Sequence, residues 1–279
     1  MSGRALFGPQ SPWHGGVVSA ETECVLAPNA SPWTLDGTNT WIIGAHGSTC
    51  VVVDPGPLED GHREAIESRL EERRHSVSAV VLTHGHIDHS AGADEFARRH
   101  GVGVRAWDPA LAFSPAHSSD PSVLCAGESI DLDGLRVSVM ATPGHSSDSV
   151  SLVVGDVVLT GDTVLGRGTS LVAHPDGRLA EYLESLRALS SLCSEAGIRL
   201  LLPGHGPVLD EPAKVIEYYL EHRQDRLAQV LTAVRAGATT SGEIVERVYA
   251  DVPKQVWPAA ESTVLAQLDY LTETGRIDI

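Results

Sequence analysis

Three histidines and one aspartate stand within six consecutive positions of this chain, at His84, His86, Asp88 and His89. They directly follow an apolar run, residues 79–82, that is typical of a buried strand. Neutral imidazole nitrogens and carboxylate oxygens are the ligands that zinc and similar ions accept in proteins. A tight turn from a strand into a helix can direct alternate side chains towards two neighbouring ions. The spacing therefore predicts a metal site at the end of this strand.

Further segments place a residue of the same kind next to a glycine, just after a predicted strand. His145 lies in the sequence Thr-Pro-Gly-His, Asp162 in Gly-Asp-Thr and His205 in Gly-His-Gly. Glycine permits the sharp backbone turns that such positions need, and loops at the ends of sheet strands commonly carry functional residues. Several separate strand ends that each supply His or Asp predict one common metal site.

The elements that would position these residues alternate along the first two hundred residues or so of the chain. Short apolar runs bounded by Gly, Asp or Pro predict strands, and apolar residues three or four apart predict helices. The predicted strands are 23–27, 40–44, 49–54, 77–83, 103–107, 129–132, 135–141, 150–154, 157–160 and 198–202, and the predicted helices are 61–74, 90–100 and 179–195. Residues 1–20 are expected to be irregular, and 109–128 to form a surface loop long enough to cover a site. This alternation predicts a layered α/β domain with sheets inside and helices outside.

The composition changes after Pro212, where the helical signal becomes continuous. Residues 213–236 contain neither Gly nor Pro and place apolar side chains on one helical face. The other predicted elements are a helix that opens with a capping-like start at Thr240-Ser241-Gly242-Glu243, a helix at 259–274 that ends at Gly275, and a strand at 276–279. These elements predict a small winged-helix-like domain, so the expected domains are 1–212 and 213–279.

The overall charge narrows the classes of partner. The formal net charge is −17, which argues against non-specific affinity for nucleic acids or anionic membranes.

The four cysteines form no CxxC pair and are expected to be buried thiols rather than a disulfide framework. The sequence shows no signal-peptide pattern and no apolar run of the roughly 20 residues needed to span a bilayer. A cytoplasmic protein that does not act in a membrane is therefore expected.

The order of the motifs HxHxDH, TPGH, GD and GHG resembles the metallo-β-lactamase superfamily of binuclear metallo-hydrolases, over roughly residues 39–206. The resemblance implies a four-layered αββα fold. It also implies that His84, His86 and His145 hold one metal ion, that Asp88, His89 and His205 hold a second, and that Asp162 bridges the two. Two Zn²⁺ ions are the expected cofactors, and Mn²⁺ or Fe²⁺ suit the same ligands.

Three further residues are candidates to hold the ligand histidines in place. Ligand histidines need a partner for their second ring nitrogen, and Asp54, Thr83 and Thr163 stand at the strand ends nearest the motifs. Asp54 ends a strand in the sequence Val-Asp-Pro-Gly, where an ordinary role in forming the turn is an equal alternative.

Departures from the superfamily's best-known members indicate a branch. The commonest metal-dependent β-lactamases use a cysteine at the second site, whereas this chain has Asp162 together with His89, so β-lactam hydrolysis is not expected as its main activity. The segments Leu35–Thr40, Gly161–Thr169 and Tyr219–Arg223 make it look most like the lactamase-beta-2-like group. Some members of that group act on single-stranded RNA, and fungal relatives act as thioesterases on carrier-bound polyketides. The resemblance therefore leaves the substrate open.

The expected function is a binuclear zinc-dependent hydrolase that uses a metal-bridging hydroxide, acting on a small-molecule ester or thioester. Asp88, which would orient the nucleophile, and Asp162 are the expected catalytic residues. Asn39, Arg167, Thr169 and Ser170 are candidates for substrate contact. Arg167 could pair with a phosphate or carboxylate, and an exposed loop arginine is an equal alternative.

Other functions are compatible with the same motifs. One is an endoribonuclease specific for single-stranded RNA, a second is a non-catalytic nucleic-acid-binding regulator that uses the tail, and a third is redox chemistry on iron in the same site. The tail from Ala213 carries seven Lys and Arg residues against ten Asp and Glu residues, which weakens the regulator and mildly weakens the ribonuclease. The tail is expected instead to pack on the catalytic domain and to shape a substrate groove or a homodimer contact.

Overall fold

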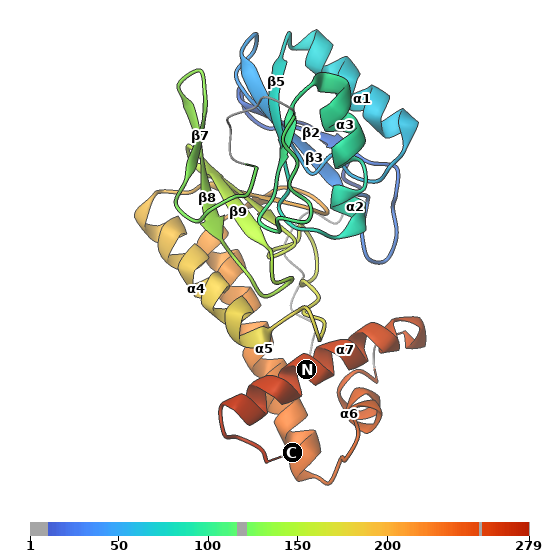
Figure 1. Cartoon of the computed structure of the whole chain (residues 1–279). Coiled ribbons are helices and arrows are strands. Elements are labelled where there is room, and N and C mark those ends of the chain that lie inside the picture. The colour runs from blue at the N-terminus through green and yellow to red at the C-terminus, as the bar shows by residue number, and fades with distance from the viewer. Residues whose placement is uncertain (1–10, 116–121, 251–252, 279) are drawn as a thin grey trace.

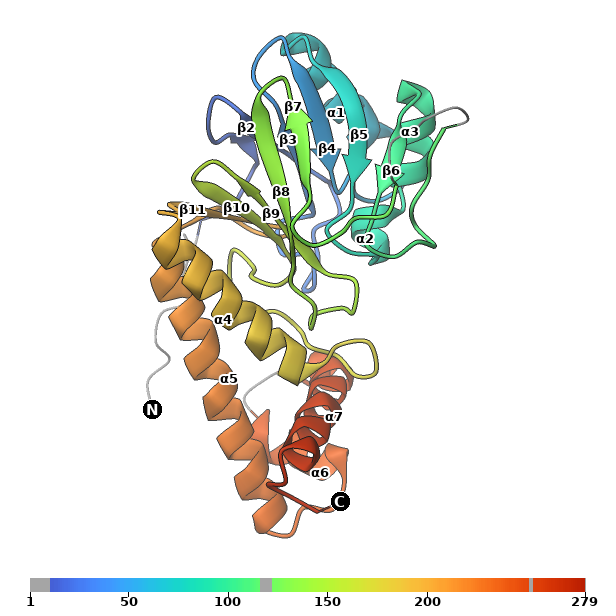
Figure 2. The ribbon, with the colours of Figure 1, turned by 60° about the vertical axis from the view of Figure 1, so that its left-hand side comes forward.

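Two six-stranded sheets face each other in this computed structural model, which describes residues 11–115, 122–250 and 253–278. Helices cover the outer face of each sheet, and a group of helices extends from one end of the sheet layers (Figure 1). The turned view in Figure 2 shows the same layers from another side, with α4 and α5 packed along the second sheet. The predicted αββα fold with a helical C-terminal part is confirmed.

The first sheet has the strand order β1-β2-β3-β4-β5-β6. Its strands are β1 (Gly16–Val17), β2 (Thr22–Leu26), β3 (Asn39–Ile43), β4 (Thr49–Val53), β5 (Ser76–Val81) and β6 (Gly103–Arg105). Strands β1 to β4 form an antiparallel meander, whereas β4, β5 and β6 are parallel and are joined by α1 (Asp60–Glu72), α2 (Ile87–Ser90) and α3 (Ala93–His100).

The second sheet has the strand order β12-β11-β10-β9-β8-β7. Its strands are β7 (Ser129–Leu132), β8 (Leu135–Ala141), β9 (Val150–Val154), β10 (Val157–Gly161), β11 (Leu200–Pro203) and β12 (Leu209–Asp210). Only β10 and β11 are parallel, and α4 (Leu179–Glu195) connects them.

Alternation along the strands builds separate cores on the two faces of each sheet. Trp41 and Ile43 of β3 belong to the core between the sheets, whereas Ile42 belongs to the core beneath α1 and α3. Successive strand side chains point to opposite faces, so an unbroken apolar run is what a strand buried on both faces requires. These cores fix the strand ends from which the site is built.

The C-terminal helices share one core with the second sheet. They are α5 (Pro212–Arg235), α6 (Ser241–Val248) and α7 (Trp257–Glu273), with a 3₁₀ turn at Lys254–Val256. One cluster of buried apolar residues includes Val158 of β10, Leu186 of α4 and Leu271 of α7. Thr240 and Glu243 form the predicted capping box at the start of α6. The expected domain boundary at 212/213 coincides with the start of α5, a helix that takes part in this shared core.

Several expected elements differ from the structure. The predicted terminal strand is wrong for Arg276 to Asp278, which are irregular, and Ile279 lies outside the described residues. The Arg276 amide instead donates to the carbonyl of Leu271, 2.8 Å away, and so closes the end of α7. The predicted helix 90–100 is two helices, α2 and α3, and α2 begins early enough to carry Asp88. The segment 1–20, which was expected to be irregular, contains the short strand β1.

Parts of the predicted loop 109–128 pair with the edge of the first sheet. Phe113 bridges to Val104, and Val123 bridges to Ala106. The Leu111 side chain lies beside Gly85, so this segment reaches the turn that carries the first histidines. Among the described residues, none of the helices is both long enough and apolar enough to span a membrane.

Candidate metal centre

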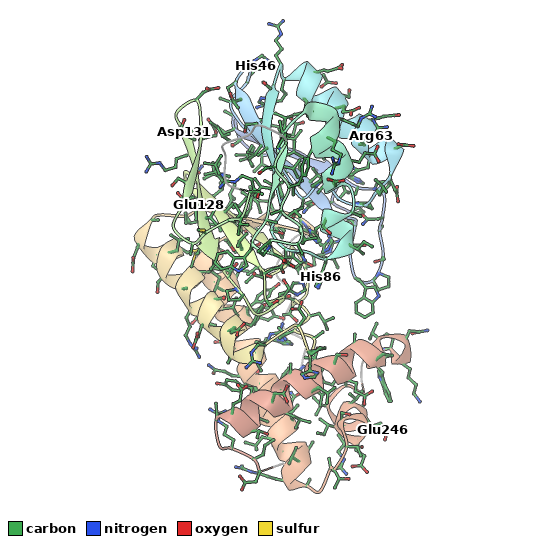
Figure 3. All side chains as sticks on the ribbon, viewed as in Figure 1. His46, Arg63, His86, Glu128, Asp131 and Glu246 are labelled. Atoms are coloured by element: carbon green, nitrogen blue, oxygen red, sulfur yellow. The ribbon has the colours of Figure 1, made fainter. Side chains whose placement is uncertain are left out.

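All seven predicted ligands meet at one edge of the sheet layers. His84 and His86 follow β5, and Asp88 and His89 lie on α2, while His145, Asp162 and His205 follow β8, β10 and β11. Strands β8, β10 and β11 run in the same direction, so their carboxyl ends reach the same edge. Figure 3 shows His86 at the end of the sheet layers nearest the C-terminal helices.

Three histidine nitrogens converge to form a first group. Nδ1 of His86 lies 3.1 Å from Nε2 of His84 and 3.0 Å from Nε2 of His145. Nitrogens that share a tetrahedral zinc ion, each roughly 2.0–2.1 Å from it, lie about 3.3 Å from one another. The observed spacing therefore fits three ligands around one ion, with a fourth position open.

A second group forms beside the first. Nε2 of His205 lies 3.2 Å from Nε2 of His89 and 3.1 Å from Oδ2 of Asp88. Two imidazoles and one carboxylate are again a ligand set that zinc accepts. In each of the two groups, the ligand atoms all lie within 4.8 Å of one another, close enough to hold one metal ion.

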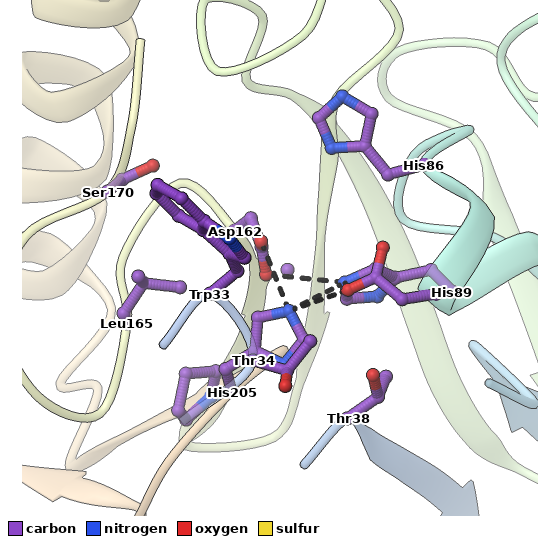
Figure 4. Close-up of polar contacts among 12 residues, drawn as sticks. Trp33, Thr34, Thr38, His86, His89, Asp162, Leu165, Ser170 and His205 are labelled. Carbon is purple, nitrogen blue, oxygen red and sulfur yellow. Dashed lines mark hydrogen bonds and ion pairs between the residues drawn. The ribbon is translucent and has the colours of Figure 1, made fainter. Parts of the chain in front are cut away.

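Asp162 lies between the two groups. Its Oδ1 is 3.5 Å from Nε2 of His89, and its Oδ2 is 3.4 Å from Nε2 of His205 and 3.8 Å from Nε2 of His145 (Figure 4). Oδ1 is buried and has no hydrogen-bond partner among the described residues. A buried carboxylate oxygen without a donor is costly, and a cation between the groups would remove that cost.

Glycine is required where the His205 turn passes Asp162. A Cβ atom on Gly204 would lie 2.4 Å from Oδ1 of Asp162 and 2.7 Å from Cε1 of His89. Such contacts are far too short for any side chain. The glycine before His205 therefore lets the turn approach close enough to complete the second group.

Four of the five histidines are oriented through their second ring nitrogen. Each Nδ1 faces a protein oxygen: Thr83 Oγ1 at 3.0 Å for His84, Asp54 Oδ2 at 2.9 Å for His89, the Leu171 carbonyl at 2.7 Å for His145 and the Gly37 carbonyl at 3.1 Å for His205. In each case Nδ1–H donates, which leaves the Nε2 lone pair directed into the centre. These four side chains are therefore oriented so that Nε2 is the nitrogen available to a metal ion.

Asp54 bonds to several of the groups that orient the histidines. Its carboxylate accepts hydrogen bonds from the Thr83 amide (2.7 Å), the Thr83 hydroxyl (2.6 Å) and His89. Through Thr83 it also orients His84. Its backbone has φ of +50°, a value typical of tight turns. Both expected roles of Asp54 therefore hold, and Thr83 is a partner as predicted. Thr163 is not, because its hydroxyl faces the Thr142 carbonyl at 3.5 Å.

Burial and charge separate the protonation states of the two groups. Burial lowers the pKa of His84 and of His145. Burial also opposes protonation of His205, but Asp162 and Asp88 outweigh it and raise the His205 pKa to about 10. Burial opposes ionisation of Asp162, but the charges of His205 and His89 hold its pKa well below the usual range. Without metal, His205 therefore retains a proton at a pH at which His84 and His145 are neutral.

This difference predicts that the two groups bind metal with different pH dependence. A metal ion that enters the second group must displace the His205 proton, so affinity there should rise roughly tenfold per pH unit below a pKa of about 10. The first group, where burial lowers the pKa of His84 and of His145, should depend less on pH. Competition with a chromophoric chelator between about pH 6.5 and 8.5 would measure both affinities. Two sites with the same flat pH profile would contradict this assignment.

The residues expected to contact substrate occupy different environments. Asn39 is fully buried, and its amide donates to the carbonyls of Pro203 and Gly206, 2.9 and 2.8 Å away. It therefore holds the His205 turn and has no exposed surface for a substrate, which corrects the prediction for this residue. Arg167 forms an ion pair with Asp36. Thr169 and Ser170 line a pocket next to the centre, and the Ser170 hydroxyl is 3.2 Å from Nδ1 of His145.

Some supporting groups could not be found by reading side chains. The carbonyls of Gly37 and Leu171 orient His205 and His145. Every residue carries a carbonyl, so the sequence holds no local signal for those that face a ligand. Arg223, whose guanidinium donates to the Ser170 carbonyl, lies on α5, and its burial depends on the packing of the tail.

Comparison with known proteins agrees with this centre. Residues 33–205 match the metallo-beta-lactamase superfamily, and residues 240–278 match the beta-lactamase associated winged helix domain. The first match covers more than half of the chain and all seven residues of the centre. The chain therefore belongs to the metallo-β-lactamase superfamily, whose members are usually metal-binding hydrolases.

Relatives with curated names cover most of the chain. It is 30% identical to the beta-lactamase-like protein 2 homolog of Drosophila melanogaster over 91% of this chain and 89% of that protein. It is 31% identical to the atrochrysone carboxyl ACP thioesterase of Aspergillus fumigatus over 86% of this chain and 77% of that protein. A solved beta-lactamase domain protein from Burkholderia ambifaria superposes with a TM-score of 0.77 at 22% identity, covering 97% and 92% of the two chains. This last likeness supports the fold.

Proposed function

We propose that this protein hydrolyses an ester or thioester with the help of two zinc ions held by the seven residues of the centre. The observation that carries the proposal is the position of Asp162, within 3.5 Å of His89 and 3.4 Å of His205 and within 3.8 Å of His145. Zinc ions bound there would lower the pKa of a water molecule and polarise the carbonyl oxygen of the substrate.

The protein's own groups would orient the reactants. Burial opposes ionisation of Asp88, but hydrogen bonding to His205 and the nearby charge of His89 outweigh it and lower the Asp88 pKa. Asp88 therefore stays ionised at neutral pH and can accept a hydrogen bond from the attacking water. It is also more exposed than Asp162, with 28% against 11% of its side chain accessible, so it is the easier of the two for water to reach.

The choice of acyl substrates draws on the relatives. One of the similar curated proteins is named as a thioesterase that acts on an acyl carrier protein. The fold and the centre are compatible with the same chemistry in this chain, because thioester hydrolysis needs only an activated water and a polarised carbonyl.

A second candidate is cleavage of single-stranded RNA. The pocket beside the centre is lined by Arg167, Arg223 and Arg226, and arginine is well suited to phosphate. The acidic net charge of −17 counts against wide, non-specific contact with RNA. Acyl hydrolysis is therefore the first candidate.

A panel of substrates tests the proposal. Zinc-loaded protein would be assayed with N-acetylcysteamine thioesters, aryl esters, lactones, an aryl phosphodiester and a short single-stranded RNA. We expect thioesters or esters to be hydrolysed fastest, with activity lost on chelation and restored by zinc. A protein that carries two zinc ions yet turns over no ester or thioester would refute the proposal, and cleavage of the RNA alone would establish the second candidate.

A further inference from the structure

A pocket of about 330 Å³ lies between the loop that follows β10 and the C-terminal helices. We call it the interdomain pocket. Most of its walls are apolar or small. They are Pro32, Trp33, Leu35, Leu165, Arg167, Gly168, Thr169, Ser170, Leu171, His222, Arg223, Arg226, Tyr249, Val256, Ala259, Ala260 and Thr263. A cavity of this size and lining is typical of a site for a small organic group.

The interdomain pocket adjoins the metal centre. Ser170 belongs to its wall and also lies 3.2 Å from Nδ1 of His145. Figure 4 shows Trp33, Leu165 and Ser170 on the side of Asp162 that faces away from His89. A substrate whose scissile bond reaches the centre could therefore extend into this pocket.

The charge of the pocket is opposite to that of the chain. The lining contains three arginines and one histidine, and none of the described residues in it is an aspartate or a glutamate. The chain as a whole has a net charge of −17. Asp36, outside the lining, neutralises Arg167. Among the described residues, Arg226 donates to two neutral groups, the Gln229 side chain at 3.0 Å and the Val248 carbonyl at 2.9 Å.

Arg223 is the most deeply buried of these cations. Only 3% of its surface is exposed, and its guanidinium donates to the Ser170 carbonyl and lies 4.9 Å from the centre of the Tyr182 ring. Among residues 11–115, 122–250 and 253–278, its Nε–H has no acceptor and no carboxylate forms an ion pair with it. A buried, unpaired charge is costly unless a counter-charge joins it.

Its neighbour offers a second open polar group. Nδ1 of His222 is buried and has no hydrogen-bond partner among the described residues. Two adjacent residues of α5 that line the pocket therefore leave part of their hydrogen-bonding capacity unused. Such an arrangement suits a ligand that carries one anionic group on an apolar body.

We infer that the interdomain pocket receives an anionic group of the substrate, a carboxylate on its acyl part or a phosphate on its carrier part, and that Arg223 is the residue that selects it. The inference rests on the proposed hydrolysis, because it names the substrate class for that centre. Arg223 touches the substrate remote from the scissile bond, so its effect is on specificity.

Matched substrates test the inference. The N-acetylcysteamine thioesters of octanoate and of suberate differ by one terminal carboxylate. The octanoyl thioesters of pantetheine and of 4′-phosphopantetheine differ by one phosphate. For each pair, the quantity measured is the ratio of kcat/KM for the anionic substrate to kcat/KM for the neutral one. The wild-type protein is expected to favour the anionic member of one pair.

Variants at position 223 show whether Arg223 causes the preference for the anionic substrate. Arg223→Gln is expected to reduce the preferred ratio roughly 10- to 100-fold, the loss expected for a charged hydrogen bond. Arg223→Lys, which keeps the charge, should restore part of it. Arg235→Gln is the control, since Arg235 is an exposed arginine of the same helix. A fall in the suberyl ratio assigns the pocket to an acyl carboxylate, and a fall in the phosphopantetheine ratio assigns it to phosphate.

Two outcomes would overturn the inference. One is a wild-type preference for neither anionic substrate. The other is an Arg223→Gln protein in which both ratios match those of the wild type, even if overall activity falls, since that is the effect of merely holding the Ser170 loop. Calorimetric binding of suberate and octanoate to the zinc-loaded proteins gives a readout without turnover. If neither esters nor thioesters are hydrolysed, the proposed function fails. The inference about the pocket is then tested by binding alone: suberate should bind more tightly than octanoate, and Arg223→Gln should remove the difference.

Discussion

Replacement of Asp162 with asparagine is expected to lower kcat/KM for hydrolysis by more than the roughly hundredfold that loss of a supporting residue costs. The Asp162 carboxylate lies near the Nε2 atoms of ligands in both groups, His145 on one side and His89 and His205 on the other. Asparagine keeps the shape but removes the negative charge that offsets two neighbouring cations. Bound zinc should fall from two ions per chain to one or fewer.

The fold should survive this change. Only 11% of the Asp162 side chain is accessible, and asparagine fills the same space, so the circular dichroism spectrum should match that of the wild type. Asp156→Asn is a fitting control, because Asp156 precedes the same strand, β10, at its far end, is 46% exposed and pairs with Arg199. It should keep both zinc ions and full activity. Turnover and zinc content unchanged in Asp162→Asn would remove Asp162 from the mechanism.

Replacement of Asp54 with asparagine is expected to weaken zinc binding and activity roughly 10- to 100-fold, although Asp54 is no ligand in this account. Its carboxylate bonds to His89 directly and to His84 through the Thr83 hydroxyl. The asparagine side chain has one accepting oxygen in place of two, and its NH2 group cannot accept. One of the present donors would therefore lose its acceptor. The backbone should tolerate the change, because asparagine readily adopts positive φ.

Two comparisons show whether Asp54 acts through the histidines. Thr83→Val breaks the path to His84 but leaves the bond to His89, so its effect should be smaller than that of Asp54→Asn. Asp133→Asn controls for the backbone, since Asp133 also has positive φ, +55°, in an exposed turn between β7 and β8. Zinc affinity by chelator competition would measure all three. Equal losses in Asp54→Asn and Asp133→Asn would show that Asp54 matters only as a turn former.

The ligands could be predicted because their side chains carry the chemistry and the strands carry the position. The run from His84 to His89 follows β5, and each later ligand stands one to four residues past a strand whose apolar pattern is clear. Helix α4 matches its predicted bounds because leucines at a spacing of three define its buried face. The local sequence pattern was therefore sufficient to predict the ligand residues and helix α4.

Other features depend on contacts between distant segments. Nothing near Gly37 indicates that its carbonyl orients His205, which is far away in the chain. Asn39 was expected at the substrate, but the close approach of the His205 turn buries it. Burial of Arg223 likewise follows from packing of α5 against the loop that carries Ser170. The predicted terminal strand does not form at Arg276 to Asp278, because the Arg276 amide donates to the Leu271 carbonyl at the end of α7.

The number of zinc ions bound per chain tests the central claim most directly. Purified protein would be equilibrated with zinc, freed of excess metal and measured by elemental analysis against protein concentration. Two groups of three ligands that share Asp162 predict a value close to two. A protein that contains no metal as purified and takes up none when zinc is added would contradict the account, whatever its fold.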